Sequence, residues 1–193
     1  MKIAITGHTK GIGKACADLF NHHTIYGYTR SNGYDISDPE KIFKNAEECD
    51  VFINNAYWRK YQVDLFKLFF NSWEHTNKHI INVNTIVKYP REVPILERYK
   101  SDKIALQNAV DEVYLGPKGH GSCKVTNINP GRVATGQVEN YEYITSYNWE
   151  KGGEFTTHDP KPPYPSLDPV EVAKVIKWCV EQDFNIYDIT LSR

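Results

Sequence analysis

Short apolar runs alternate along this chain with longer segments in which apolar residues recur at helical spacing. The pattern predicts helices near 11–22, 38–48, 61–76, 98–114 and 168–182, and strands at 2–6, 24–29, 50–54, 78–84, 122–128 and 186–191. Runs such as 51–53 and 80–83 are β-branched and apolar on both faces, as in buried parallel strands. We therefore expect residues 1–193 to form a single doubly wound, Rossmann-like α/β domain, with a mostly parallel sheet and helices on both faces.

Two helix starts carry a local signal that supports this order. Asp38 precedes Pro39, and Asp168 precedes Pro169, so each pair places a capping carboxylate before a proline at the first helical position. Asp35 lies just before the first of these helices. We expect a very short third strand to end there.

Residues 136–167 break the alternation. They contain four prolines, a Gly152-Gly153 pair and many aromatic residues. A long irregular segment inside a compact domain is usually a lid or a contact surface. An apolar pocket and a dimer interface both favour such aromatic side chains, and either use fits Tyr57, Trp58, Tyr141, Tyr143, Tyr147, Trp149, Phe155 and Tyr164.

Composition and charge exclude several classes of protein. The net charge is −1 and no basic tract appears, so nucleic acid is not an expected partner. No apolar run approaches the length of a membrane span, and the N-terminus begins directly with a predicted strand, so we expect neither a membrane anchor nor a signal peptide. The four cysteines are far apart in the sequence, which fits free thiols in a reducing cytoplasm. A homo-oligomer is possible.

A glycine-rich turn follows the first predicted strand. Gly7, Gly11 and Gly13 separate the apolar run 2–6 from an amphipathic stretch that begins at Ile12. Glycine lets the backbone approach a pyrophosphate, and the free N–H groups of a helix start point at it. The turn therefore indicates a nucleotide site, although a tight strand-to-helix turn without a ligand would use the same residues.

The pattern Tyr-x-x-x-Lys occurs at Tyr99/Lys103, Tyr114/Lys118 and Tyr147/Lys151. Only the first copy lies in a sustained helical pattern, which places both side chains on one face. A phenol is a poor acid or base at neutral pH, and an ammonium one turn away favours its ionised form. The same spacing also fits a packed core tyrosine with a lysine whose stem lies along it.

Five motifs in order make the chain resemble the short-chain dehydrogenase/reductase family over nearly its whole length. Residues 6–13, TGHTKGIG, are similar to its Thr-Gly-x-x-x-Gly-Ile-Gly loop, and Asn54-Asn55-Ala56 to its Asn-Asn-Ala-Gly, with Tyr57 in place of the glycine. Residues 82–85, NVNT, correspond to Asn-x-Ser-Ser, and Tyr99-x-x-x-Lys103 follows. Residues 130–135, PGRVAT, resemble Pro-Gly-x-Val-x-Thr.

The resemblance implies that NAD(P)(H) lies across the carboxyl ends of the strands and exchanges a hydride with a carbonyl or alcohol carbon. Tyr99 would transfer the proton, Lys103 would lower the pKa of Tyr99 and bind the nicotinamide ribose, and Thr85 would hydrogen-bond the substrate oxygen. Asp35-Ile36 corresponds to the family's adenine-contacting pair. The implied cofactor residues are Gly7, Thr9, Lys10, Gly11, Ile12, Arg30, Asp35, Ile36, Asn54, Asn55, Ala56, Lys103, Pro130, Gly131, Val133 and Thr135.

The chain departs from this family in the segment between Ala56 and Asn82. That segment is about half the usual length, and the family places there a long helix with a catalytic asparagine that supports a relay water. Gln62 is the residue nearest the expected asparagine, and its amide could hold such a water or merely open the helix.

Two cations bear on the choice of cofactor. No acidic residue ends the second predicted strand, where NAD-binding proteins commonly have one. Arg30 offers a planar, charged fork for a 2′-phosphate, and Lys10 adds a second positive charge in the glycine loop. NADP(H) is therefore preferred over NAD(H).

His75 and His79 are four residues apart at a predicted helix end, a spacing that can bind zinc. A solvated helix terminus explains them better, so no metal is expected. The leading hypothesis is an NADP-dependent oxidoreductase acting on a carbonyl or alcohol of a small-molecule substrate. The alternative is a catalytically weak or inactive NADP-binding protein, such as a redox sensor or an interaction scaffold. An epimerase or dehydratase is disfavoured because no C-terminal substrate domain is apparent.

Overall fold

The computed structural model describes residues 1–86, 97–116, 121–135, 144–148, 154–157 and 166–192. Five α-helices and one 3-10 helix lie in these ranges: α1 (Gly11–Leu19), η1 (Arg30–Asn32), α2 (Pro39–Ala46), α3 (Tyr61–Trp73), α4 (Glu97–Leu115) and α5 (Pro169–Glu181). The strands are β1 (Lys2–Thr6), β2 (Thr24–Tyr28), β3 (Val51–Asn54), β4 (His79–Val83), β5 (Lys124–Pro130), β6 (Ile144–Asn148), β7 (Glu154–Thr157) and β8 (Asp188–Leu191).

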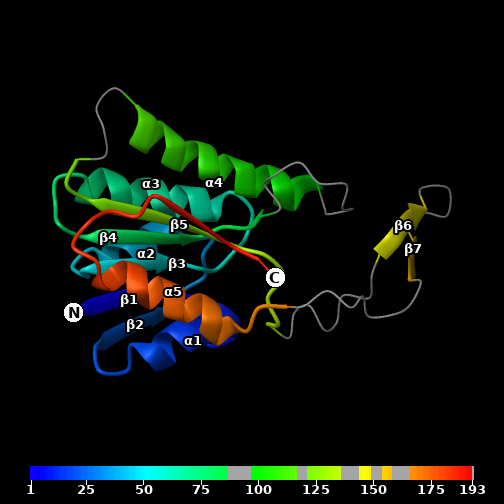
Figure 1. The fold of residues 1–193 in the computed structure, drawn as a ribbon, viewed down its shortest axis with the longest axis horizontal. Coiled ribbons are helices and arrows are strands. Elements are labelled where there is room, and N and C mark those ends of the chain that lie inside the picture. Colours follow the sequence, from blue (N-terminus) through cyan, green and yellow to red (C-terminus); the bar gives the residue numbers. More distant parts are fainter. Residues whose placement is uncertain (87–96, 117–120, 136–143, 149–153, 158–165, 193) are drawn as a thin grey trace.

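Six strands form one parallel sheet in the order β2-β1-β3-β4-β5-β8 (Figure 1). Both ends of the chain contribute to it: β1 is the second strand from one edge, and β8 forms the other edge. The order reverses after β1 and β2, because β3 pairs with the other side of β1. This reversal is the place where open parallel α/β sheets bind ligands at the carboxyl ends of their strands.

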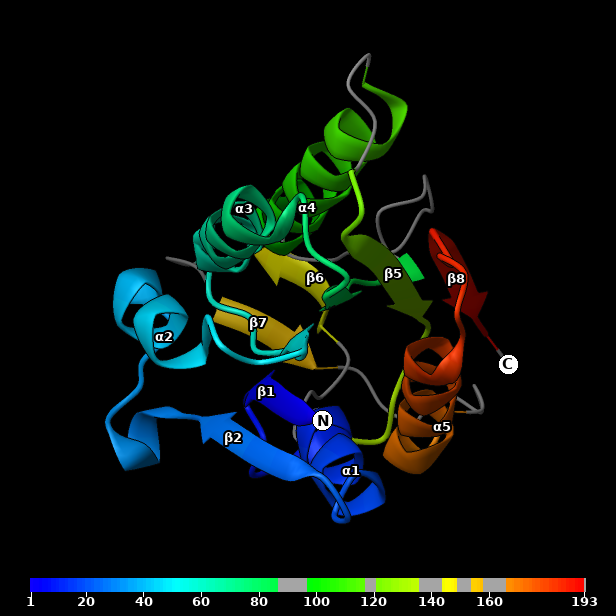
Figure 2. The same cartoon turned by 90° about the vertical axis from the view of Figure 1, so that its left-hand side faces the viewer.

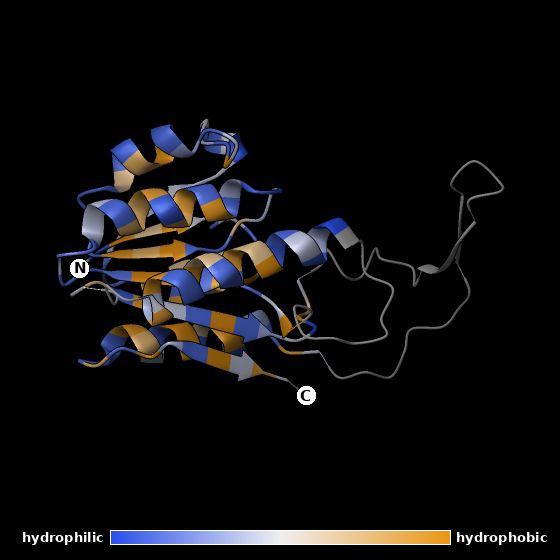
Figure 3. Ribbon diagram, turned by 90° about the horizontal axis from the view of Figure 1, so that it is seen from above, coloured by the Kyte–Doolittle hydropathy of each residue, from blue (hydrophilic) through white to orange (hydrophobic). Residues whose placement is uncertain are grey.

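Helices cover both faces of the sheet, as the alternating pattern predicted (Figure 2). Side chains at odd positions of β1 pack with α1 and α5, while Ala4 and the side chain of Phe52 in β3 pack with α2, α3 and α4. Apolar positions line the strands and the adjacent helix sides in Figure 3. Successive strand residues point to opposite faces, so strands covered on both sides must be apolar throughout.

Both predicted helix caps are present. The Asp38 side chain accepts from the N–H of Lys41, and the Asp168 side chain accepts from the N–H of Val170. Glu171 completes a capping box by accepting from the backbone N–H of Asp168.

Three sequence expectations need correction. No strand ends at Asp35 in the described part of the chain: the backbone turns there, with Asp35 O accepting from Asp38 N, and β2 forms the sheet edge. Within 136–167, residues 144–148 and 154–157 pair as an antiparallel hairpin rather than running irregularly. Residues 136–143, 149–153 and 158–165 lie outside the described residues, and with them Tyr141, Tyr143, Trp149 and Tyr164.

The third correction concerns His75 and His79. Helix α3 ends at Trp73, so the two residues do not share a helix face. His79 begins β4, is 3% exposed, and its Nε2 bonds the Thr126 hydroxyl at 2.9 Å. The described residues contain no group of three side chains able to hold a metal ion.

None of the described helices combines the length and apolar character needed to cross a bilayer.

Burial lowers the pKa of His79 to about 3. At a pH below 6.5, the ordinary pKa of histidine, His79 binds a proton in the unfolded chain but stays neutral in the folded protein. Acid therefore favours unfolding. We expect the free energy of unfolding to fall between pH 6.5 and 4.5, by up to about 1.4 kcal/mol per pH unit from this one group. Urea unfolding across this window should show the slope in the wild type and a smaller slope in His79→Gln. The variant His75→Gln changes an 85% exposed side chain and should keep the wild-type slope; equal slopes in all three proteins would contradict the assignment.

Candidate functional site

The glycine-rich loop after β1 forms a backbone cradle. Gly7 and Gly11 have φ angles of +72° and +53°, which side-chain-bearing residues rarely adopt. A Cβ on Gly13 would lie 2.3 Å from the carbonyl oxygen of Gly7, so only glycine fits at that position. The Gly7 N–H donates to the Tyr28 carbonyl at 2.8 Å and ties the loop to β2. Thr9 and Lys10 are exposed beside this cradle, while Ile12 is buried in the core below it.

The end of β3 is fastened to the end of β1 through one hydroxyl. Thr6 is 1% exposed, and its Oγ1 accepts from the N–H groups of Asn55 and Ala56, each at 2.9 Å. The side-chain Nδ2 of Asn55 donates in turn to the Thr6 carbonyl at 2.9 Å. The sequence-predicted residues Asn55 and Ala56 therefore lie directly against the glycine loop, where a Cβ on Gly7 would also meet both.

Asn54 has a different environment from the one the sequence suggested. It has no exposed surface, and its Nδ2 donates to Gln62 O at 2.8 Å and to Asn82 Oδ1 at 3.0 Å. These bonds occupy the Asn54 side-chain nitrogen within the protein, so the role of Asn54 toward a nucleotide stays a prediction. Asn54 links β3, β4 and α3 below the site.

The loop after β5 also reaches the glycine loop. Gly131 N donates to Leu191 O at 2.7 Å, and buried Val133 forms a bridge with Leu167. Thr135 ends this stretch, and its Cγ2 lies 3.0 Å from the point where a Cβ on Gly11 would sit. The chain thus runs from the end of β5 to the glycine loop after β1, and it carries the predicted residues Pro130, Gly131, Val133 and Thr135.

Three predicted cofactor residues follow β2, and the structure places them in different environments. Arg30 begins η1 and is exposed. Asp35 accepts from Ser37 N at 2.8 Å; this bond, a further one from the Ser37 side chain and the Arg30 charge hold the pKa of Asp35 below its usual range. Ile36 is 8% exposed and packs with Tyr28 and other core residues, so its surroundings are those of a core side chain.

The second half of the site is built around a buried lysine. Lys103 of α4 is 3% exposed, and its Nζ donates to Gln62 Oε1 at 2.7 Å and to Val83 O at 2.9 Å. Gln62 Nε2 donates to Asn54 O at 2.8 Å and to Val83 O at 3.0 Å, which fixes the amide. The sequence suggested that this amide could hold a water; in the structure it contacts the lysine directly. Burial lowers the pKa of Lys103 to about 7, and neighbouring Asp102 opposes this shift.

Tyr99 and Thr85 lie beside this lysine. The ring centroid of Tyr99 is 5.7 Å from Lys103 Nζ, one helical turn along the same face of α4. Thr85 is 6% exposed and follows two residues after Val83, whose carbonyl holds both Lys103 and Gln62. The four residues predicted to be catalytic therefore gather where β4 ends. Lys118 and Lys151 of the other two Tyr-x-x-x-Lys copies lie outside the described residues.

The sequence reasoning missed two contacts in this group. Tyr57 donates through its hydroxyl to Asp102 Oδ2 at 2.8 Å, and its ring meets the Tyr99 ring edge to face. In the sequence Thr6 is only the first residue of the glycine-loop motif, whereas in the structure its hydroxyl joins the ends of β1 and β3. The sequence carries two signals for Tyr57: it is one of the aromatic residues that fit a pocket or an interface, and it stands where the family that the chain resembles has glycine.

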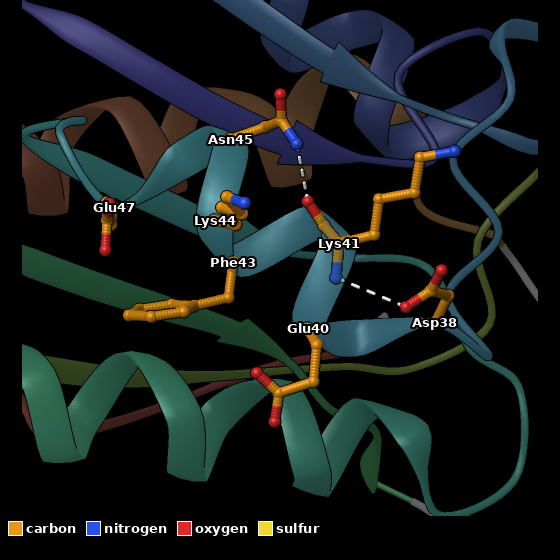
Figure 4. A pocket seen from close by; sticks show the side chains of 7 residues that line it. All are labelled: Asp38, Glu40, Lys41, Phe43, Lys44, Asn45 and Glu47. Carbon is orange, nitrogen blue, oxygen red and sulfur yellow. Dashed lines mark hydrogen bonds between the residues drawn. The ribbon is translucent and has the colours of Figure 1, made fainter.

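A separate surface hollow lies along α2 (Figure 4). Its polar groups bond within α2 and to the turn before it: Lys41 N donates to Asp38 Oδ1 at 3.2 Å, Asn45 Nδ2 donates to Lys41 O at 2.8 Å, and Lys41 Nζ donates to Gly33 O at 2.9 Å. Charges of both signs line the hollow without converging on a common point, so it does not share the features of the site at the strand ends.

The Thr6 hydroxyl provides a test of how the site is held together. Thr6→Val keeps the shape of the side chain but leaves two N–H groups without their acceptor, and we expect it to destabilise the protein by about 2 kcal/mol or more. Thr24→Val on exposed β2 should stay within about 0.5 kcal/mol of the wild type. Chemical unfolding of the three proteins measures the difference; equal stability of Thr6→Val and Thr24→Val would show that these bonds do not hold the strand ends.

Comparisons with known proteins agree with this architecture. No family model matches the chain, and no curated protein sequence does. Among solved structures, a 3-alpha-hydroxysteroid dehydrogenase from Pseudomonas sp. B-0831 complexed with NADH aligns with a TM-score of 0.73 at 16% identity, over 98% of this chain and 94% of that one. A short chain dehydrogenase from Burkholderia cenocepacia J2315 in complex with NADP gives 0.73 at 13% identity, over 100% and 88%. Serine dehydrogenase from Escherichia coli gives 0.70 at 16%, over 100% and 98%. The chain therefore has the fold of the short-chain dehydrogenases.

Proposed function

We propose that this protein is an oxidoreductase of the short-chain dehydrogenase type that transfers a hydride between NADP(H) and a carbonyl or alcohol of a small molecule. The observation that carries the proposal is the Lys103 ammonium, held beside the Tyr99 ring by Gln62 and Val83. This pair lies at the same end of the sheet as the glycine loop, where parallel α/β sheets bind ligands. The fold neighbours named above include complexes with NADH and with NADP.

The residues at the strand ends fit a dinucleotide. Gly7, Gly11 and Gly13 leave a cradle of backbone only, and a Cβ on Gly13 would fill it. The N–H groups of the loop and of the first turn of α1 would hold the pyrophosphate. Asn55, Ala56 and the loop 130–135 would flank the rest of the cofactor, and Lys103 its nicotinamide ribose. When bound, the cofactor supplies or accepts the hydride.

The protein's own residues would handle the proton. In the direction of reduction, Tyr99 Oη gives its proton to the carbonyl oxygen of the substrate, and in oxidation it takes the proton back. The Lys103 ammonium favours the negative charge left on that phenol oxygen. Thr85 Oγ1 donates a hydrogen bond to the same substrate oxygen. Gln62 acts as a positioning residue, because its amide fixes Lys103 from below.

Two positive charges, one after β2 and one in the glycine loop, support a preference for NADP(H). Arg30 is exposed where the adenosine ribose would lie, and a guanidinium fork matches a phosphate. Lys10 is exposed in the glycine loop.

An NADP-binding protein with little or no turnover is the second candidate. It is favoured by the direct hydrogen bond from Lys103 Nζ to Gln62 Oε1. In a proton relay, a water molecule would accept that hydrogen bond instead. We also propose a cytoplasmic location and a homo-oligomeric state. The four cysteines are free and buried, which fits a reducing cytoplasm, and a homo-oligomer is compatible with the fold.

Nucleotide titration tests the cofactor assignment. We expect NADPH to bind more tightly than NADH, and Arg30→Ala to weaken NADPH binding by about tenfold or more while changing NADH binding little, because a charge-assisted phosphate contact is worth about 1.5–3 kcal/mol. Lys44→Ala removes an exposed cation on α2, outside the proposed cofactor site, and should leave the binding of both nucleotides unchanged. Energy transfer from protein tryptophan to bound NADPH reports the dissociation constants. If Arg30→Ala weakened the binding of NADPH and NADH equally, Arg30 would not select NADP(H).

Removal of one phenol tests the chemistry. We expect Tyr99→Phe to lower kcat by about 10²–10⁴-fold on an aldehyde or ketone panel, the range of a lost general acid, with NADPH binding unchanged. Tyr114→Phe removes a phenol farther along the same helix, one that accepts from Asn185, and should keep wild-type kcat. Turnover that survives in Tyr99→Phe would exclude Tyr99 as the acid. Nucleotide binding without any turnover in the wild type would favour the inactive, NADP-binding alternative.

A further inference from the structure

Tyr57 occupies a fixed place in the turn between β3 and α3. The residue before it, Ala56, donates its N–H to Thr6 Oγ1 at 2.9 Å. Arg59 adopts a left-handed φ of +50°, and Tyr61 N donates to Trp58 O at 3.2 Å, so the turn closes tightly into α3. The backbone on both sides of Tyr57 is thus held by hydrogen bonds, and its side chain leaves this turn toward α4.

Three residues of α4 receive that side chain. The Tyr57 hydroxyl donates to Asp102 Oδ2 at 2.8 Å. Its ring meets the Tyr99 ring edge to face, with centroids 4.8 Å apart and an interplanar angle of 82°. Lys103 Nζ lies 5.4 Å from the Tyr57 ring centroid. Residues 99, 102 and 103 share one helix face, so a single side chain from the β3 turn contacts the face that carries the proposed acid and its lysine.

We propose that Tyr57 is a positioning and specificity-determining residue: through its bond to Asp102 and its edge contact with Tyr99, it orients the Tyr99 phenol and walls the space beside it against bulky substrates. This inference rests on the proposed function and deepens it by naming the class of substrate. The ring takes space that the glycine of the resembling family would leave open. Small, unbranched carbonyl compounds fit beside such a wall better than compounds with a ring next to the carbonyl carbon.

Tyr57 acts here through shape rather than by moving a proton. Its hydroxyl hydrogen is donated to Asp102 Oδ2. Burial and the Asp102 carboxylate raise the pKa of Tyr57, so the phenol keeps its proton. The bond also keeps the Asp102 carboxylate in place next to Lys103, where its charge favours the ammonium form.

Two aldehydes of different bulk test the wall. We would measure kcat/KM for propanal and cyclohexanecarbaldehyde with NADPH in the wild type, Tyr57→Gly and Tyr57→Phe. Tyr57→Gly should raise the ratio of the bulky to the small substrate by about tenfold or more, in the range that added hydrocarbon makes in a pocket. Tyr57→Phe keeps the ring and should keep the ratio, while lowering kcat for both. Phe184→Gly removes an exposed ring near the start of β8, at the opposite end of the sheet. It should change neither the substrate ratio nor kcat. An unchanged ratio in Tyr57→Gly would overturn the specificity role.

A second measurement needs no nucleotide. Urea unfolding of the wild type, Tyr57→Phe, Asp102→Asn and the double variant should show that the two changes together destabilise the protein less than the sum of their separate effects, since both remove one bond. Strict additivity would overturn the Tyr57–Asp102 contact on which the inference depends. Wild-type protein that binds NADPH and turns over propanal, with an unchanged ratio in Tyr57→Gly, overturns the inference and leaves the proposed function standing. Wild-type protein that binds neither nucleotide overturns both, even where the unfolding cycle shows coupling.

Discussion

One buried nitrogen, Nζ of Lys103, imposes the strongest constraint on this structure. An ammonium taken out of water is costly unless hydrogen bonds replace its hydration. Gln62 from α3 and the Val83 carbonyl at the end of β4 supply those bonds, so three elements must meet at one point. The Tyr99 ring sits one turn away on the same helix, and its position therefore follows from the same packing.

A row of amides below this point holds the strands in place. Asn54, Asn82 and Asn127 lie side by side in β3, β4 and β5, in register across the sheet. Asn54 bonds Asn82 and the Gln62 backbone, and Asn127 donates to Gln107 of α4 at 3.0 Å. A slip of one residue would turn these amides toward the apolar face packed by α1 and α5, where they would lose their partners. The polar row thus gives a sheet of apolar strands one preferred register, and it fixes the ends that carry the site.

The short segment between β3 and β4 explains why side chains of the β3 turn matter here. Helix α3 begins at Tyr61, only a few residues after the strand, and Gln62 in its first turn already reaches Lys103. The side-chain amide of Gln62 is therefore a direct hydrogen-bond partner of Lys103 Nζ. The same tight turn directs Tyr57 onto α4, so a compact connection brings both a positioning amide and an aromatic wall to the proposed acid.

The sequence by itself determined the fold class and the order of elements, because apolar periodicity and the caps at Asp38 and Asp168 are local properties that neighbouring residues set. Helix ends were predicted less well: α3 stops at Trp73, before the predicted end at residue 76. His79 lies buried in the predicted strand and not at a solvated helix terminus. Motif order also placed Tyr99, Lys103 and Gln62 in one candidate group, but not their contacts. Only the tertiary structure decided that Gln62 bonds Lys103 directly, that Asn54 is buried, and that Tyr57 bonds Asp102. These contacts join residues that lie between 8 and 45 positions apart, and no local pattern encodes such distances.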